Sequence, residues 1–260
     1  MRGSRATAAM LPVLGVVCAG FLGGVAAAEP LPSGSTFLGE VLRAQQADDA
    51  SNPGMLWVDE GARLWALAPA AGGPSCAGCH GAPGTLRGVA TRYPAVDAAS
   101  GRLLNLEMRI NACRSERQGA EPYRYESDEL LALTALVAHQ SRGLAMQVAT
   151  DGAAAPHHAA GRALFHRRQG QLNLSCAQCH VDNAGRRLRG DVISHGLPNG
   201  YPAYRLEWQS LGSLHRRLRA CSAGVRAVQF DYGSPEYLAL ELYLASRARG
   251  VAIEAPAIRR

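Results

Sequence analysis

The residues that most directly indicate chemistry are two C-x-x-C-H motifs, CAGCH at Cys76–His80 and CAQCH at Cys176–His180. Two thiols one helical step apart can bond the two vinyl groups at one porphyrin edge, and the adjacent histidine then reaches the iron. A single copy is also compatible with a redox dithiol or half of a zinc site, but two copies in one chain favour haem. We therefore predict two covalently bound haem c groups. Their attachment residues are Cys76, Cys79, Cys176 and Cys179, and their first axial iron ligands are His80 and His180.

The second axial position of each iron distinguishes an electron shuttle, which usually uses methionine, from rarer chemistry. The last methionine of the chain is Met146, so none follows the second motif, and Met108 lies one helical step off the apolar face of its predicted helix. His139, His195 and His215 are available, but they occupy no matching positions in the two halves. Lysine is absent from the sequence and is excluded as a ligand.

Two further cysteines, Cys113 and Cys221, do occupy equivalent positions. Each ends a series of apolar residues spaced three or four apart, which places both on the buried stripe of a helix. We predict that Cys113 and Cys221 face their own haems and complete the axial ligation. A disulfide between the two is the alternative, because leftover cysteines commonly pair in an oxidising compartment.

The motifs belong to a longer internal repeat. Residues 61–80 correspond to residues 161–180 at an offset of 100. At an offset of 108, YPA at 93–95 corresponds to YPA at 201–203, and RINAC at 109–113 corresponds to RLRAC at 217–221. At an offset of 107, SDELLAL at 127–133 corresponds to SPEYLAL at 234–240. Landmarks in one order at nearly one spacing indicate duplication. The sequence therefore predicts two tandem cytochrome c-like domains.

The elements that position these residues are predicted to be helices, since the periodic segments have helical spacing and no strong alternating pattern occurs. Ser127 and Ser234 have the character of helix starts, and Gly143 and Gly250 that of stops. A stretch of small and polar residues around Asp151 has the composition of a linker. We predict a mainly α fold with domains at 29–150 and 151–260.

The N-terminus predicts export. Arg2 and Arg5 precede an apolar run that ends in three alanines before Glu29, which is typical of a signal peptide over residues 1–28. We expect a periplasmic protein without a membrane anchor, because the apolar run is short and no basic stop-transfer cluster follows it. Removing residues 1–28 takes two arginines and no acidic residue, so the net charge falls from +6 to +4, and the basic residues are scattered. A nucleic-acid partner is unsupported.

Six ordered segments resemble SoxA, the dihaem subunit of the SoxAX cytochrome of sulfur oxidation. They are NPGMLW, CAGCH, RINACRSERQGA, SCAQCH, RRLRACSAGVRA and YGSPEYLALELYLA, and they extend from about Asn52 to Arg249. The resemblance implies two cytochrome c-like domains and haem ligation by His80 with Cys113 and by His180 with Cys221. It also implies that Cys221 carries the reactive sulfur, often as a persulfide, and that a small monohaem cytochrome c subunit (SoxX-like) is a partner.

The resemblance further implies an L-cysteine S-thiosulfotransferase. Such an enzyme conjugates thiosulfate oxidatively to a cysteine of a sulfur-carrier protein (SoxYZ-like), and two electrons leave through haem to an electron-accepting cytochrome. Arg217 precedes Cys221 by one helical turn, where its guanidinium can hold sulfonate oxygens, and the family arginine at this position is implicated in substrate binding. Arg216 and Arg219 are interpreted as solvated residues or propionate partners.

Our hypothesis is that Cys221 acts mainly as a nucleophile or persulfide, while the first haem is structural or vestigial. A non-catalytic dihaem electron-transfer protein is the principal alternative, and a dihaem peroxidase or a haem-thiolate sensor is less favoured. The absence of methionine after Met146 disfavours the electron-transfer protein and the peroxidase, and the lack of an output domain disfavours the sensor.

Overall fold

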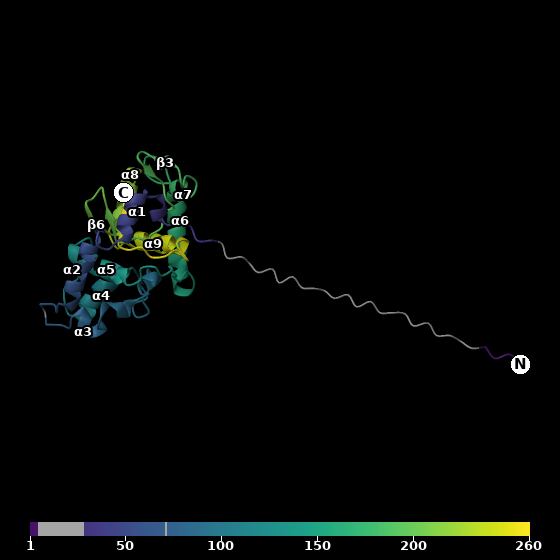
Figure 1. Cartoon of the computed structure of the whole chain (residues 1–260), viewed down its shortest axis with the longest axis horizontal. Coiled ribbons are helices and arrows are strands. Elements are labelled where there is room, and N and C mark those ends of the chain that lie inside the picture. The colour runs from purple at the N-terminus through teal and green to yellow at the C-terminus, as the bar shows by residue number, and fades with distance from the viewer. Residues whose placement is uncertain (5–28, 71) are drawn as a thin grey trace.

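The computed structural model describes residues 1–4, 29–70 and 72–260, so most of the predicted signal peptide lies outside the described residues. The α-helices are α1 (Glu40–Ala47), α2 (Met55–Ala66), α3 (Cys76–His80), α4 (Leu106–Arg117), α5 (Asp128–His139), α6 (Ala155–His166), α7 (Cys176–His180), α8 (Leu214–Gly224) and α9 (Pro235–Arg247). Short 3-10 helices are η1 (Gly34–Phe37), η2 (Pro83–Leu86), η3 (Ala90–Arg92) and η4 (Gly152–Ala154). Helices α2 to α5 form one lobe and α6 to α9 the other (Figure 1).

The strands are short: β1 (Ala95–Val96), β2 (Leu103–Leu104), β3 (Arg187–Leu188), β4 (Asp191–Val192), β5 (Ala203–Arg205), β6 (Ser210–Gly212) and β7 (Ala257–Arg259). They form the antiparallel hairpins β1–β2 and β3–β4 and a three-stranded sheet in the order β6–β5–β7, in which β5 and β7 are parallel. Two or three residues are too few to give a period-two pattern, which explains why no strand was expected from the sequence. The mainly α prediction is confirmed.

One helix pair forms the frame of each lobe, α2 with α5 and α6 with α9. Glycine permits both close crossings: a Cβ at Gly61 would lie 2.3 Å from the Ala132 carbonyl oxygen, and one at Gly161 would lie 1.9 Å from that of Ala239. No side chain fits at either crossing, and the same close contact occurs at both repeat positions. The duplicated sequence therefore produces a duplicated helix pair.

The predicted helix starts are confirmed. Ser127 caps α5 by accepting a hydrogen bond from the Leu130 amide, and Ser234 caps α9 by accepting one from the Tyr237 amide. The predicted stops are displaced, since α5 ends at His139 and α9 at Arg247. Gly143 and Gly250 instead have φ of 83° and 82° in the turns that follow, a conformation that favours glycine.

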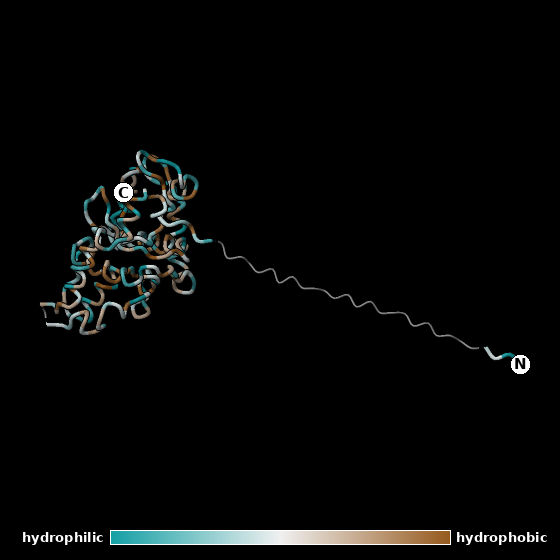
Figure 2. The backbone as a smooth tube through the Cα atoms, in the orientation of Figure 1, coloured by the Kyte–Doolittle hydropathy of each residue, from teal (hydrophilic) through white to brown (hydrophobic). Residues whose placement is uncertain are grey.

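The two lobes share a hydrophobic core. Helix α5 is buried at every position from Leu130 to Ala138, and residues of α9 such as Leu238 and Leu242 join the same cluster. Figure 2 shows hydrophobic segments along the middle of the molecule, where the lobes meet. Backbone hydrogen bonds also join the lobes, from the Met146 amide to the Val251 carbonyl and from the Ile253 amide to the Leu144 carbonyl. No helix of the described ranges is long and apolar enough to cross a membrane.

The N-terminal segment packs on the far end of the chain. Helix α1 contacts strand β7, and Asn52 donates a hydrogen bond to the Pro256 carbonyl at 2.9 Å. The Ile258 amide donates to the Gln46 side chain at 3.0 Å. Residues 33–52 thus complete the second lobe, and the division at Asp151 stays a prediction.

Candidate functional site

The second motif lies on α7, whose first turn is fixed by a capping box. The Ser175 hydroxyl accepts a hydrogen bond from the Gln178 amide at 3.3 Å, and the Gln178 side chain accepts one from the Ser175 amide at 2.9 Å. This arrangement fixes the helical turn that spaces Cys176 and Cys179. The motif is therefore held by residues directly beside it in the sequence.

His180, at the end of α7, has a defined orientation. Its Nδ1 lies 2.8 Å from the carbonyl oxygen of Ser194, which can only accept, so Nδ1 carries the proton and Nε2 is left for another partner. Gly196 has φ of 68° and packs under the ring, where a Cβ would lie 2.9 Å from Cγ of His180. Arg247 donates to the His195 carbonyl at 2.9 Å and covers the Phe165 ring. An imidazole held in this way suits an axial iron ligand.

Cys221 lies on α8 and meets His180. Burial alone would raise the pKa of the Cys221 thiol, but a side-chain hydrogen bond with His180 and the positive charges of Arg217 and Arg205 bring that pKa below its ordinary value. The structure thus brings together three residues predicted as a group, His180, Cys221 and Arg217. It adds Arg205, which the sequence analysis did not single out.

Arg217 sits one helical turn before Cys221, near the N-terminus of α8. The turn begins at Ser213, whose hydroxyl accepts a hydrogen bond from the Arg216 amide at 3.2 Å. Nη1 of Arg217 lies 3.7 Å from Oε1 of Glu207, on the turn between β5 and β6. Arg216 lies over the Trp208 ring at 4.2 Å and donates from Nη1 to the Ser210 hydroxyl at 3.3 Å.

The first motif, on α3, also begins at a capping serine, but other residues surround it. Ser75 caps the helix by accepting from the Gly78 amide at 3.0 Å, and Trp65 packs near the His80 ring with centroids 5.7 Å apart. Burial raises the pKa of Cys113, an effect that Arg109 partly offsets. A cavity of about 510 Å³ opens beside this motif and is lined by Leu64, Leu67, Cys76, Arg114, Gln118, Tyr123 and Leu133 among others.

The residues at both motifs fit haem c. All six cysteines of residues 29–70 and 72–260 are free thiols, which disfavours the disulfide alternative. Besides burial, the charge of Cys113 contributes to the raised pKa of Cys76, and the charge of Cys79 to the raised pKa of Cys113. In the second lobe, besides burial, the charge of Cys221 contributes to the raised pKa of both Cys176 and Cys179, so the three thiols of each lobe lie near one another. Each remaining cysteine therefore lies by the motif of its own lobe. The donor set, two attachment thiols with a histidine and a further thiol, suits haem iron in a cytochrome.

Three of the residues considered as alternative ligands, His139, His215 and Met146, have other neighbours. His215 is fully buried, with Nε2 3.0 Å from Oε2 of Glu241 and Nδ1 accepting from the Gly233 amide. His139 lies beside Asp49 at 3.8 Å. Met146 is buried and lines an interior cavity away from both motifs.

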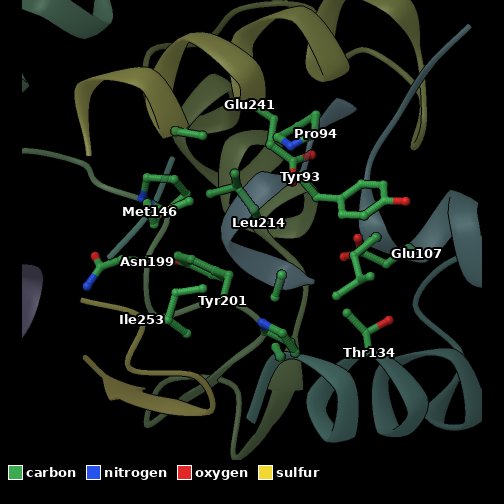
Figure 3. A pocket seen from close by; sticks show the side chains of 16 residues that line it. Tyr93, Pro94, Glu107, Thr134, Met146, Asn199, Tyr201, Leu214, Glu241 and Ile253 are labelled. Atoms are coloured by element: carbon green, nitrogen blue, oxygen red, sulfur yellow. The ribbon is translucent and has the colours of Figure 1, made fainter. Parts of the chain in front are cut away.

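That interior cavity, about 50 Å³, lies between the lobes (Figure 3). Equivalent residues of the repeat line it, including Tyr93 and Tyr201, and two carboxyl groups, Glu107 and Glu241, share it. Burial, with the charge of Glu241, raises the pKa of Glu107 to about 8. None of the haem-attachment cysteines lines this cavity.

Sequence reasoning missed Ser194, Gly196, Arg205 and Glu207. Ser194 acts through its backbone carbonyl, which no side-chain pattern reveals. Arg205 had a signal, since it lies 108 residues after Asp97 and this offset aligns the surrounding repeat.

Comparison with known proteins identifies the family and the fold of this chain. The family model described as SoxA/TsdA, cytochrome c domain, matches residues 60–146 and 160–253, one segment in each lobe. The L-cysteine S-thiosulfotransferase subunits SoxA of Paracoccus pantotrophus and Rhodovulum sulfidophilum are both 40% identical, over 87% and 89% of this chain and 78% and 81% of the relatives. The crystal structure of SoxXA from P. pantotrophus matches with a TM-score of 0.84 at 39% identity, covering 88% of this chain and 87% of that one. With a match in each lobe and a like fold over most of its length, the chain belongs to the SoxA family of c-type cytochromes.

Proposed function

We propose that this chain is the dihaem subunit of an L-cysteine S-thiosulfotransferase that conjugates thiosulfate oxidatively to a carrier-protein cysteine. The observation that carries this proposal is the grouping of Cys221 with His180 and Arg217 in the second lobe. The named activity of the 40% identical relatives supports it.

In the proposed reaction, a thiol of the carrier loses its proton and bonds to the terminal sulfur of thiosulfate. A disulfide linkage bearing the sulfonate forms, and two electrons leave to an electron-accepting cytochrome. Haem c, when bound, supplies the one-electron redox chemistry that this requires. Arg217 orients the sulfonate beside Cys221, and burial excludes water from the reacting sulfur atoms.

The proposed cofactor sites number two. Haem c is attached through Cys76 and Cys79 in the first lobe and through Cys176 and Cys179 in the second. His80 and Cys113 would hold the iron in the first lobe, and His180 and Cys221 would hold it in the second. The polarised thiol of Cys221 supports a reactive role for it, whereas the pKa of Cys113 is raised. On this basis the second lobe holds the active site, and the first haem is structural or vestigial.

The proposed setting is the periplasm, after removal of the signal peptide. The partners are a small monohaem cytochrome c of SoxX type, a SoxYZ-like sulfur carrier, thiosulfate and an acceptor cytochrome. The likeness to a SoxXA crystal structure supports the first of these partners. No nucleic acid and no membrane anchor take part in the proposal.

Replacing Cys221 with methionine tests the proposal. We expect the C221M variant to retain both haems but to lose conjugation, because the reactive thiol is gone. The matched control is C113M, which changes the equivalent residue of the first lobe and should keep conjugation. The measurement is the mass of the carrier cysteine after incubation with thiosulfate and an electron acceptor.

Full conjugation by C221M would remove Cys221 from the mechanism. Electron paramagnetic resonance of the same samples reports whether thiolate ligates the second iron. The second candidate function, a non-catalytic dihaem electron carrier, predicts reduction and reoxidation without any modified carrier.

A further inference from the structure

The hairpins next to the two cysteine-bearing helices are equivalent but carry opposite charges. In the first lobe Ala95 pairs with Leu104, and in the second Ala203 pairs with Gly212, an offset of 108 on both strands. The same offset relates Asp97 to Arg205 and Arg109 to Arg217. Where the first lobe has an acidic residue, the second has an arginine.

In the first lobe this position neutralises the helix arginine. Nη1 of Arg109 donates to Oδ1 of Asp97 at 3.1 Å, which forms an ion pair between the hairpin and α4. Ser100 also donates to the Asp97 carboxylate at 2.7 Å. Arg109 therefore has a dedicated carboxylate and gives little net attraction for an external anion.

In the second lobe the two arginines share one carboxylate oxygen. Nε and Nη2 of Arg205 both lie 2.9 Å from Oε1 of Glu207, and Nη1 of Arg217 lies 3.7 Å from the same oxygen. The Arg205 side chain is only 7% exposed. Two guanidinium groups thus converge on one point with a single negative charge between them, which leaves an excess positive charge.

Glu207 approaches this point from outside. It lies in the turn between β5 and β6, and its side chain is 50% exposed, so it can leave the arginines and be hydrated at little cost. Arg205 is held in place, because it is buried and stacks over Trp208. A carboxylate oxygen therefore stands where an oxyanion of a substrate would be bound.

Building on the proposed function, we propose that Arg205 and Arg217 form an oxyanion subsite for the sulfonate of thiosulfate, and that Glu207 occupies it until substrate binds. The subsite lies at the turn of α8 that precedes Cys221. Arg205 is then a positioning residue that fixes the sulfonate end, while Glu207 competes with the substrate. The first lobe lacks the subsite because Asp97 satisfies Arg109.

The test is the KM for thiosulfate in conjugation by the intact holoenzyme complex. We expect R205Q to raise KM on the order of 10- to 100-fold, with kcat changed less, because a charged hydrogen-bond donor is lost. The KM of R205K should fall between those of the wild type and R205Q. E207Q should lower KM by roughly 2- to 10-fold and make sulfate a stronger competitive inhibitor, since the internal carboxylate no longer competes. R109Q, which breaks the equivalent pair of the first lobe, should leave KM unchanged.

The proposal is overturned if R205Q keeps the wild-type KM, or if E207Q raises KM. E207Q changes an exposed turn, so it decides the question even where R205Q fails to fold. Calorimetric titration with thiosulfate, without the carrier, separates this idea from the function itself. If the wild type never conjugates but R205Q binds thiosulfate more weakly than the wild type, the proposed function is overturned and the subsite stands. If the wild type conjugates and R205Q binds thiosulfate as tightly as the wild type, only the subsite is overturned.

Discussion

The buried carboxyl group of Glu107 should make the stability of this protein depend on pH. Glu107 is 6% exposed, and its pKa is raised to about 8 by burial and by Glu241. In the unfolded chain the same group has an ordinary pKa near 4.5. The folded state therefore holds a proton that the unfolded state releases throughout this window. Its stabilising contribution is complete below about pH 4.5 and is lost as the pH rises through about 8.

One such proton gives a slope of about 1.4 kcal/mol per pH unit in the free energy of unfolding. Over the interval between the two pKa values the effect is on the order of 4 to 5 kcal/mol. A Glu107→Gln variant removes the titrating group and keeps its shape. It should match the wild type near pH 4.5 and exceed it by a few kcal/mol near pH 8.

The measurement is urea unfolding of the oxidised holoprotein, followed by far-ultraviolet circular dichroism at several pH values. The control is Glu40→Gln, which removes an exposed carboxylate at the start of α1. It should leave the pH dependence of the wild type in place. Parallel pH profiles for E107Q and the wild type would refute the reasoning, because Glu107 would then titrate alike in both states.

Two further substitutions test the packing around the second motif. Gly161→Ala places a Cβ against the Ala239 carbonyl and should destabilise the protein by about 2 kcal/mol or more, measured as a lower Tm. The control is Gly84→Ala, which has open space around it and should keep the wild-type Tm. Equal Tm values for the two variants would contradict the close crossing of α6 and α9. Gly196→Ala both strains a positive φ and crowds the His180 ring, so it should shift the paramagnetic resonance signal of one haem and leave the other; an unchanged spectrum would show that Gly196 does not set the ring position.

The features that sequence predicted well are those encoded by neighbouring residues. The helix caps at Ser127 and Ser234 depend on bonds to amides three residues away. The buried stripe that ends in Cys221 depends on helical spacing within α8. The duplication was readable because many landmarks keep one order and spacing, and the family match in each lobe confirms two cytochrome c segments.

The features that escaped prediction depend on distant parts of the chain. The parallel pairing of Ala203 with Ala257 joins residues that no local pattern relates. The partner of His180 is a backbone carbonyl fourteen residues away, and any residue type could supply it. The convergence of Arg205 and Arg217 on Glu207 needs the register of a hairpin whose strands are too short to be seen in sequence.

The packing of the N-terminal segment on the last strand has a consequence for how the molecule forms. The bond from Asn52 to the Pro256 carbonyl spans 204 positions of the chain, and closing a loop of that length costs roughly 5 kcal/mol of entropy. The helix pair that frames each lobe closes a shorter loop and so carries a somewhat smaller entropic cost. Joining the two ends of the chain is therefore the more expensive closure, and it supplies contacts of very high sequence separation.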